Sequence, residues 1–276
     1  MELYTSEKIN ENLMCIRLKS GELLYLLEGK ERCALVDCGY GAGRLSEYIK
    51  TLTEKPVTVF LTHGHIDHAM AAPEFENVYL NKKDIPFYQK QCAVEERIGY
   101  AHAVLGAEAD ELKVEDYTPA EPNKEFLELK DGMIFNFEPF HLESYEFPGH
   151  TPGSMVFLIP EMKILILGDA CNNATFMFDE MCPPLVEYKK ALLTMREHLA
   201  GKYDRVFISH HVMEADAEIL DQMLEVCDEI LAGETDDLPF EFMGMKAFIA
   251  KKCNERFERE DGKFANLVYN KNKLFE

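Results

Sequence analysis

One short segment of the sequence gathers several side chains that bind metal ions. Residues 62–68 read Thr-His-Gly-His-Ile-Asp-His and contain three of the nine histidines of the chain. Imidazole nitrogens and carboxylate oxygens bind divalent cations, and a complete coordination shell needs several of them in one small volume. A His-rich polar loop without a metal is the simpler alternative, but this density of ligand types favours a metal site. The candidate ligands are His63, His65, Asp67 and His68. Gly64 is expected to let the backbone turn tightly between two of them.

Four neighbouring ligands do not complete two metal sites, so further ligands have to come from distant segments. Three such segments follow strand-like runs: residues 149–154 with His150, residues 168–169 with Asp169, and residues 209–211 with His210 and His211. Loops at strand ends gather on one rim of a scaffold and carry functional groups. Taken singly, a histidine there is more often an ordinary hydrogen-bonding residue, and Gly-Asp is more often a turn. Together and in this order they indicate a composite site.

The elements that position these residues alternate between strands and helices. Short apolar or β-branched runs predict strands at 23–27, 33–37 and 57–61, with a helix over 41–52. Residues 84–118 have helix-like spacing and are expected to form a helical insertion. Strand signals return at 126–129, 133–137, 140–147, 155–159 and 164–167, with Asp131-Gly132 predicting a hairpin between the first two. Amphipathic helices over 185–199 and 215–232 flank a strand at 206–209, and residues 264–269 suggest a last strand. We expect an α+β chain with two sheets sandwiched by helices. No Pro-, Gly- or Ser-rich linker divides it, so one domain over 1–276 is predicted.

Composition restricts the classes of partner and the compartment. With 29 basic and 50 acidic residues the net charge is −21, which disfavours nucleic acid and anionic membrane surfaces as partners. The eight cysteines are scattered singly, which is typical of reduced thiols. Residues 1–8 lack the pattern of a signal peptide, and no apolar run approaches the length of a membrane span. A cytoplasmic protein acting on a small molecule is expected, and its oligomeric state is left open.

The ordered motifs resemble those of the metallo-β-lactamase superfamily. The matching segments are residues 35–37, 63–68, 149–153, 168–169 and His210. The resemblance implies an αββα sandwich with metals at one edge between the sheets. It also implies that His63, His65 and His150 bind a first metal, that Asp67, His68 and His210 bind a second, and that Asp169 bridges both. Asp37 matches an aspartate that supports the ligand loop; a solvent-facing turn residue is its alternative.

The family places its last ligand one small residue after a strand, which favours His210 over His211. Because neighbouring side chains of an extended segment face opposite ways, His211 is expected to face the substrate pocket instead. Tyr100 and His102 of the insertion are further candidates for a lid or pocket, with simple packing of the insertion as an equally weighted alternative.

The implied chemistry is hydrolysis by a hydroxide bound to two divalent metals, with Asp67 orienting the nucleophile. Zinc is the first choice. Iron and manganese stay alternatives, because imidazole with carboxylate suits all three and no cysteine occupies a ligand position that would require zinc. Cys171 lies two residues after Asp169 and is expected to be a packing residue. An ester, thioester, lactone or phosphoester of a small molecule is the expected substrate.

Relatives within the superfamily are less well matched. Hydroxyacylglutathione thioesterases share the ligand pattern, but their basic stretch near the C-terminus is not found here. Secreted β-lactamases carry a cysteine ligand, and nucleases need basic surfaces. A diiron oxygen or nitric-oxide reductase resembles this pattern but has a carboxylate where His65 stands and needs a flavin domain. A non-catalytic metal-binding module is the remaining alternative, and the filled ligand positions argue against it.

Overall fold

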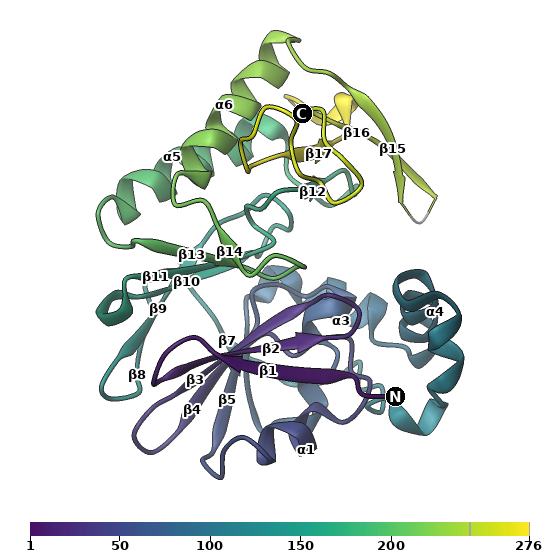
Figure 1. Cartoon of the computed structure of the whole chain (residues 1–276), viewed down its shortest axis with the longest axis vertical. Helices are drawn as coiled ribbons and strands as arrows, with labels where there is room; N and C mark the ends of the chain where they lie inside the picture. Colours follow the sequence, from purple (N-terminus) through teal and green to yellow (C-terminus); the bar gives the residue numbers. More distant parts are fainter. Residues whose placement is uncertain (243, 276) are drawn as a thin grey trace. The chain divides into compact units, whose positions relative to one another are not determined.

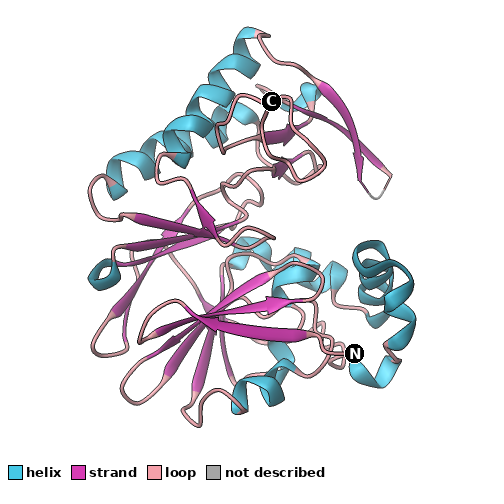
Figure 2. Cartoon of the chain, viewed as in Figure 1, coloured by secondary structure: helices cyan, strands magenta, loops and turns pink. Residues whose placement is uncertain are grey.

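The computed structural model describes residues 1–242 and 244–275. The chain forms two compact units, residues 1–142 with 209–211 and residues 143–208 with 212–276. Figure 1 labels most of their helices and strands, and Figure 2 colours them by type. The single domain over 1–276 stays a prediction.

The first unit is built on a seven-stranded sheet in the order β1 to β7. Its first four strands are antiparallel neighbours, and β4 to β7 are parallel. All four residues of β4 are buried, as are five of the six in β3. The strands are Tyr4–Lys8, Leu13–Leu18, Leu23–Glu28, Cys33–Val36, Val57–Phe60, Asn77–Leu80 and Leu127–Glu128.

The first unit contains four α-helices and several 3-10 turns among its described residues. They are α1 (Leu45–Lys50), α2 (Ile66–Ala69), α3 (Ile85–Gln91) and α4 (Val94–Leu105), with 3-10 turns at Ala72–Glu74, Lys82–Asp84, Gly106–Glu111 and Val114–Asp116. Segment 84–118 is therefore helical, as its spacing predicts. A buried apolar cluster joins the inner strands to α1, α3 and α4.

The second unit carries a mixed sheet and a smaller one. The mixed sheet runs β14-β13-β11-β10-β9, and the smaller sheet runs β12-β17-β16-β15. Helices α5 (Leu185–Leu199) and α6 (Ile219–Ala232) share an apolar core with the mixed sheet. The strands are β9 (His141–Glu146), β10 (Met155–Ile159), β11 (Ile164–Gly168), β12 (Thr175–Met177), β13 (Arg205–Ile208), β14 (Glu214–Ala215), β15 (Leu238–Phe242), β16 (Met245–Ile249) and β17 (Leu267–Tyr269).

Several sequence predictions were wrong in detail. The predicted hairpin at Asp131-Gly132 does not form, because β7 pairs in parallel with β6 while β8 (Ile134–Asn136) lies outside that sheet. The helix predicted over 41–52 begins only at Leu45, because Gly41, Gly43 and Arg44 have positive φ angles that no α-helix allows. Helix α6 begins at Ile219, since Ala215 pairs with β13 instead. The hairpin of β15 and β16 was not predicted.

Among the described residues, no helix has both the length and the apolar composition that crossing a membrane requires.

Candidate metal centre

The loop that carries the first histidines is anchored by Asp37. Asp37 directly follows β4, and Thr62 lies two residues after the end of β5. These strands are parallel neighbours, so their carboxyl ends lie at the same edge of the sheet. The fully buried Asp37 carboxylate accepts from the Thr62 backbone N–H at 2.7 Å and from the Thr62 hydroxyl at 2.8 Å. Its Oδ2 also lies 2.8 Å from Nδ1 of His68. One carboxylate therefore fixes both ends of the loop.

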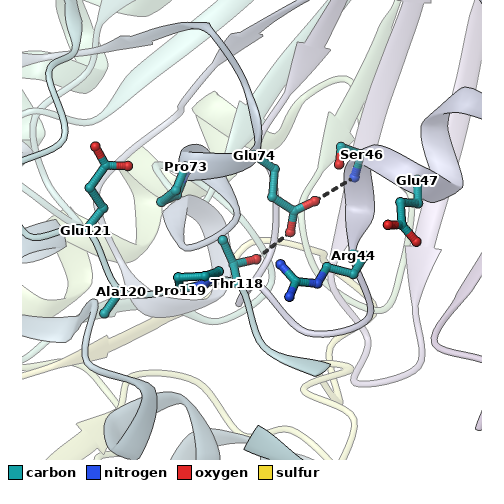
Figure 3. A pocket seen from close by; sticks show the side chains of 9 residues that line it. All are labelled: Arg44, Ser46, Glu47, Pro73, Glu74, Thr118, Pro119, Ala120 and Glu121. Carbon is teal, nitrogen blue, oxygen red and sulfur yellow. Dashed lines mark hydrogen bonds between the residues drawn. The ribbon is translucent and has the colours of Figure 1, made fainter. Parts of the chain in front are cut away.

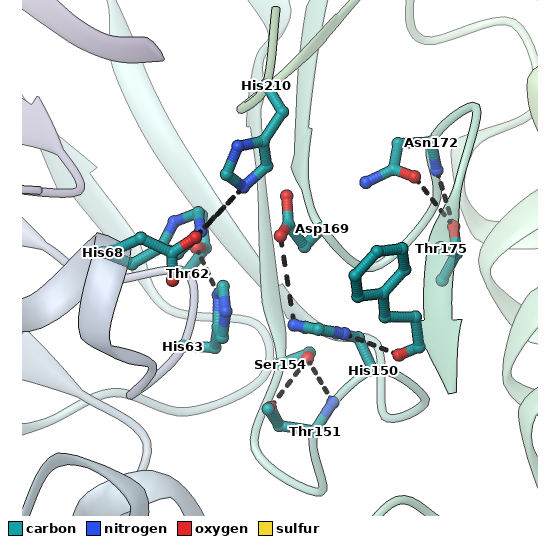
Figure 4. Close-up of polar contacts among 12 residues, drawn as sticks. Thr62, His63, His68, His150, Thr151, Ser154, Asp169, Asn172, Thr175 and His210 are labelled. Atoms are coloured by element: carbon teal, nitrogen blue, oxygen red, sulfur yellow. Dashed lines mark hydrogen bonds and ion pairs between the residues drawn. The ribbon is translucent and has the colours of Figure 1, made fainter. Parts of the chain in front are cut away.

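These contacts determine which ring nitrogen of each histidine holds the proton. Because a carboxylate only accepts, the His68 Nδ1 facing Asp37 carries the hydrogen, and its Nε2 presents a lone pair. The Thr62 hydroxyl donates to Asp37 and accepts from Nδ1 of His63 at 3.0 Å. Nδ1 of His63 therefore carries the hydrogen, and Nε2 of His63 also presents a lone pair. The Thr62–His63 contact is drawn in Figure 4.

Three ligand-type atoms of the first unit converge beside this loop. His68 Nε2 lies 3.3 Å from His210 Nε2 (Figure 4). Asp67 Oδ2 lies 3.5 Å from His68 Nε2 and 3.4 Å from His210 Nε2. Lone pairs and a carboxylate at this spacing repel one another unless a cation lies among them. The donor set therefore fits a divalent metal. Ligand atoms of His63 and His65 lie within 4.8 Å of each other, and their rings are 4.7 Å apart.

Helix α2 places Asp67 and His68 directly after the two earlier histidines. His65 is its N-cap, and the His68 backbone N–H donates to the His65 carbonyl at 3.1 Å. Gly64 is needed for a reason other than the tight turn predicted. A Cβ on Gly64 would lie 2.3 Å from the carbonyl oxygen of Asp84, whose buried carboxylate accepts from the Gly64 N–H at 3.0 Å. Asp84 was not found from the sequence, where it is one acidic residue among fifty.

The segment after β13 places His210, rather than His211, beside Asp67 and His68. Ser209 to His211 lie along the turn between β2 and β3, where Glu22 and His210 form an antiparallel bridge. His211 has a φ of 54°, and its N–H donates to the Gly21 carbonyl at 2.8 Å.

In the second unit, His150 and Asp169 lie next to each other. His150 Nδ1 lies 2.7 Å from the Phe176 carbonyl, which can only accept, so His150 Nε2 presents a lone pair as in the first unit. That Nε2 is 3.9 Å from Asp169 Oδ2 (Figure 4). Gly149 allows the loop to approach α5, because a Cβ there would lie 2.2 Å from the ring of Tyr188. Cys171 is fully buried, and burial raises the pKa of its thiol, in keeping with the predicted packing role.

The predicted pocket residues have different surroundings. Tyr100 is only 6% exposed and donates to the buried Glu22 carboxylate. Burial raises the pKa of Glu22, and the negative charge of Asp67 adds to the effect. His102 is exposed, with Nε2 4.0 Å from Asp110.

A separate cavity of about 600 Å³ in the first unit is lined by residues of segments 44–47, 73–74 and 118–121, and none of these is a predicted site residue (Figure 3). In its wall, Glu74 accepts from the Ser46 N–H at 2.8 Å and from the Thr118 hydroxyl.

Comparison with known proteins identifies the family. A model described as the metallo-beta-lactamase superfamily matches residues 21–210, well over half of the chain. The chain belongs to the metallo-β-lactamase superfamily. The predicted α+β class and metallo-β-lactamase fold are confirmed, and the chain is a metal-binding hydrolase of that superfamily.

Three relatives have names that describe hydrolysis. The chain is 33% identical to a probable metallo-hydrolase of Bacillus subtilis, over 63% of this chain and 80% of the relative. It is 27% identical to a hydroxyacylglutathione hydrolase of Haemophilus influenzae, over 66% and 80%. It is 22% identical to a human acyl-coenzyme A thioesterase, over 64% and 70%.

Solved structures support the fold alone. A metallo-beta-lactamase from Pontibacter korlensis superposes with a TM-score of 0.55 at 20% identity, over 82% of this chain and 99% of that one. A sec-alkylsulfatase from Pseudomonas sp. gives a TM-score of 0.61 at 15% identity, over 83% of this chain; the chain spans only 42% of that protein.

Proposed function

We propose that this protein is a dinuclear metallohydrolase that cleaves a thioester of a small molecule. The observation that carries the proposal is the convergence of His68 Nε2, His210 Nε2 and Asp67 Oδ2 within 3.5 Å of one another, with Asp37 fixing the tautomer of His68. This arrangement is stable around a cation and unfavourable without one.

The ligands proposed for the two metals follow from the family pattern and from the geometry within each unit. His63, His65 and His150 would hold the first ion, and Asp67, His68 and His210 the second, with Asp169 shared. In both units a histidine uses Nδ1 for a protein acceptor and keeps Nε2 for the ligand role. Zinc is the proposed metal, with iron or manganese as alternatives, because imidazole and carboxylate suit all three.

Divalent cations bound by these residues would supply Lewis acidity and lower the pKa of water to about 7. The remaining work falls to the chain. Asp67 would orient the attacking water through its carboxylate, and Asp37, through Thr62 and His68, would hold the ligand rings in one orientation. Tyr100, His102 and His211 stay proposed contacts of the substrate pocket.

The thioester proposal rests on the relatives. Two of them are named as a hydroxyacylglutathione hydrolase and an acyl-coenzyme A thioesterase, and both names denote hydrolysis of a thioester. The family match over residues 21–210 includes the loop that carries His63, His65, Asp67 and His68, and it also includes His210.

We place the protein in the cytoplasm, where thiols stay reduced. All eight cysteines are among the described residues, and no disulfide joins them.

The decisive experiment combines metal analysis with a hydrolysis panel of thioesters, esters, lactones, phosphodiesters and β-lactams. Zinc-loaded protein is expected to hydrolyse a thioester fastest. His65→Ala should abolish turnover by removing a ligand, whereas His198→Ala, an exposed histidine of α5, should not change it. Equal turnover by the wild type and His65→Ala would contradict the proposal.

The other functions are distinct outcomes of the same panel. Turnover of only a lactone or phosphoester would keep the metal centre and reject the thioester. A redox-active diiron centre with no hydrolysis would favour a reductase, and protein without stoichiometric metal would favour a non-catalytic module.

A further inference from the structure

The turn between β2 and β3 holds the segment that carries His210. Leu23 N–H donates to the Ser209 carbonyl at 2.8 Å, and His211 N–H donates to the Gly21 carbonyl at 2.8 Å. Between these bonds, Glu22 and His210 face each other as an antiparallel bridge. The backbone of His210 is therefore positioned by this turn.

Packing at the turn is close. Gly21 has a φ of 111°, and a Cβ there would lie 2.5 Å from the ring of His211. The Arg17 guanidinium donates to the His211 carbonyl at 2.9 Å. Hence a displacement of the turn would also displace the residues on either side of His210.

The side chain of Glu22 links this turn to the helical insertion. Glu22 is 1% exposed, and its carboxylate accepts from the Ser20 hydroxyl and from the Tyr100 hydroxyl of α4. A buried carboxylate is strongly destabilising unless donors replace the lost water. Ser20 belongs to the same turn as Glu22. Of these two donors, Tyr100 is therefore the one that comes from outside the turn.

We propose that Glu22 and Tyr100 form a positioning pair through which helix α4 holds His210 against Asp67 and His68 and thereby sets the affinity for the second metal. The inference rests on the ligand set of the proposed function. It assigns the insertion a role in metal binding in addition to any contact with substrate.

Tyr100→Phe removes the one hydroxyl that reaches Glu22 from α4 and keeps the ring. Zinc affinities are measured by competition with a chromophoric chelator, and the visible spectrum of the cobalt-substituted protein reports the ligand geometry. The zinc affinity of the site that contains His210 is expected to fall about 10- to 100-fold, with an altered cobalt spectrum, as for other partners that orient ligands, while the other zinc affinity stays as in the wild type. Tyr88→Phe is the matched control, because Tyr88 is a buried tyrosine of α3 whose hydroxyl donates to the Glu121 carbonyl at 3.0 Å.

The results separate positioning from other roles. Wild-type zinc affinities in Tyr100→Phe, or equal losses in both variants, would overturn the inference. A raised KM with unchanged zinc affinity would also overturn it, because that pattern belongs to a substrate contact. Glu22→Gln, which can still accept from Tyr100, should lose less affinity than Glu22→Leu; equal losses would contradict the hydrogen-bonded link.

The zinc-affinity and cobalt-spectrum measurements need no substrate. A wild type that binds two zinc ions but hydrolyses no thioester rejects the proposed function and leaves the positioning pair intact. A wild type that binds no zinc overturns the pair as well.

Discussion

Replacing Asp37 with asparagine should weaken metal binding without changing the shape of the loop. The carboxylate of Asp37 is fully buried and accepts three hydrogen bonds, two from Thr62 and one from His68. Asparagine has the same size, but its amide nitrogen cannot accept. Whichever way the amide is placed, one of the donors around it is left without an acceptor. If the nitrogen faces His68, the ring is driven to the tautomer with the hydrogen on Nε2, where a metal ligand needs a lone pair.

The magnitude follows from the hydrogen bonds that the amide nitrogen cannot accept. A hydrogen bond to a buried charged group contributes about 1.5–3 kcal/mol, so the free energy of unfolding should fall by about that amount. Loss of a partner that orients a ligand weakens metal binding about 10- to 100-fold, or about 1.4–2.7 kcal/mol. Both effects should appear together, since one carboxylate accepts from both Thr62 and His68.

Zinc competition and urea unfolding of Asp37→Asn test this directly. The matched control is Asp84→Asn, because the buried Asp84 carboxylate accepts from Gly64 N–H, a bond that the asparagine oxygen can keep. We expect the control to bind zinc as the wild type does. Wild-type zinc affinity in Asp37→Asn would refute the argument that Asp37 sets the tautomer of His68.

Three further predictions concern stability. Gly64→Ala should lower the free energy of unfolding by about 1–3 kcal/mol in urea titrations, because its Cβ would lie 2.3 Å from the Asp84 carbonyl oxygen; unchanged stability would show that the loop can shift there. Removing metal with a chelator should lower the unfolding temperature, and zinc at about 100 times its Kd should restore about 2.7 kcal/mol; an unfolding temperature that ignores zinc would contradict a resident metal. The Arg205 guanidinium lowers the pKa of Glu214 through two hydrogen bonds of 2.8 and 2.7 Å. Because the folded pKa lies below the ordinary value of 4.5, this contribution is present above that value and is lost as the pH falls through the lowered pKa. The free energy of unfolding of Glu214→Gln should therefore fall less between neutral and acidic pH than that of the wild type. The difference is expected to be below about 1 kcal/mol, since the pair is partly exposed, and a pH profile identical to that of the wild type would contradict the assignment.

The parts of the fold that the sequence predicts best are those with a strong local pattern. Strands β3, β4, β5, β10 and β11 are short apolar runs with clear boundaries, and α5 begins and ends at the predicted residues. The hairpin at Asp131-Gly132 was wrong because a turn signal fixes the local backbone but does not select the partners of the strands beside it. Likewise, the hairpin of β15 and β16 was missed for two local reasons. Residues of β15 alternate between exposed and partly buried, but Pro239 within the run argues against a strand, and β16 has no clear alternation.

The candidate site shows the same division. Histidines and aspartates close together in the sequence are recognisable, and so is an ordered set of motifs. The contacts that orient them are not. Thr62 links His63 to Asp37, and Asp84 accepts from Gly64. Both contacts depend on which strand ends lie side by side. Nothing in the local sequence of Glu22 distinguishes it from other acidic residues, so its contact with Tyr100 emerges only from the tertiary structure.

The most direct test of the central claim is the number of metal ions bound per chain. Purified protein loaded with zinc and freed of excess ions should contain two zinc ions per chain by elemental analysis, and His210→Ala should retain one, because His210 is proposed to bind only the second ion. No stoichiometric zinc in the wild type, or the same zinc content in both proteins, would contradict a two-metal centre built from these residues.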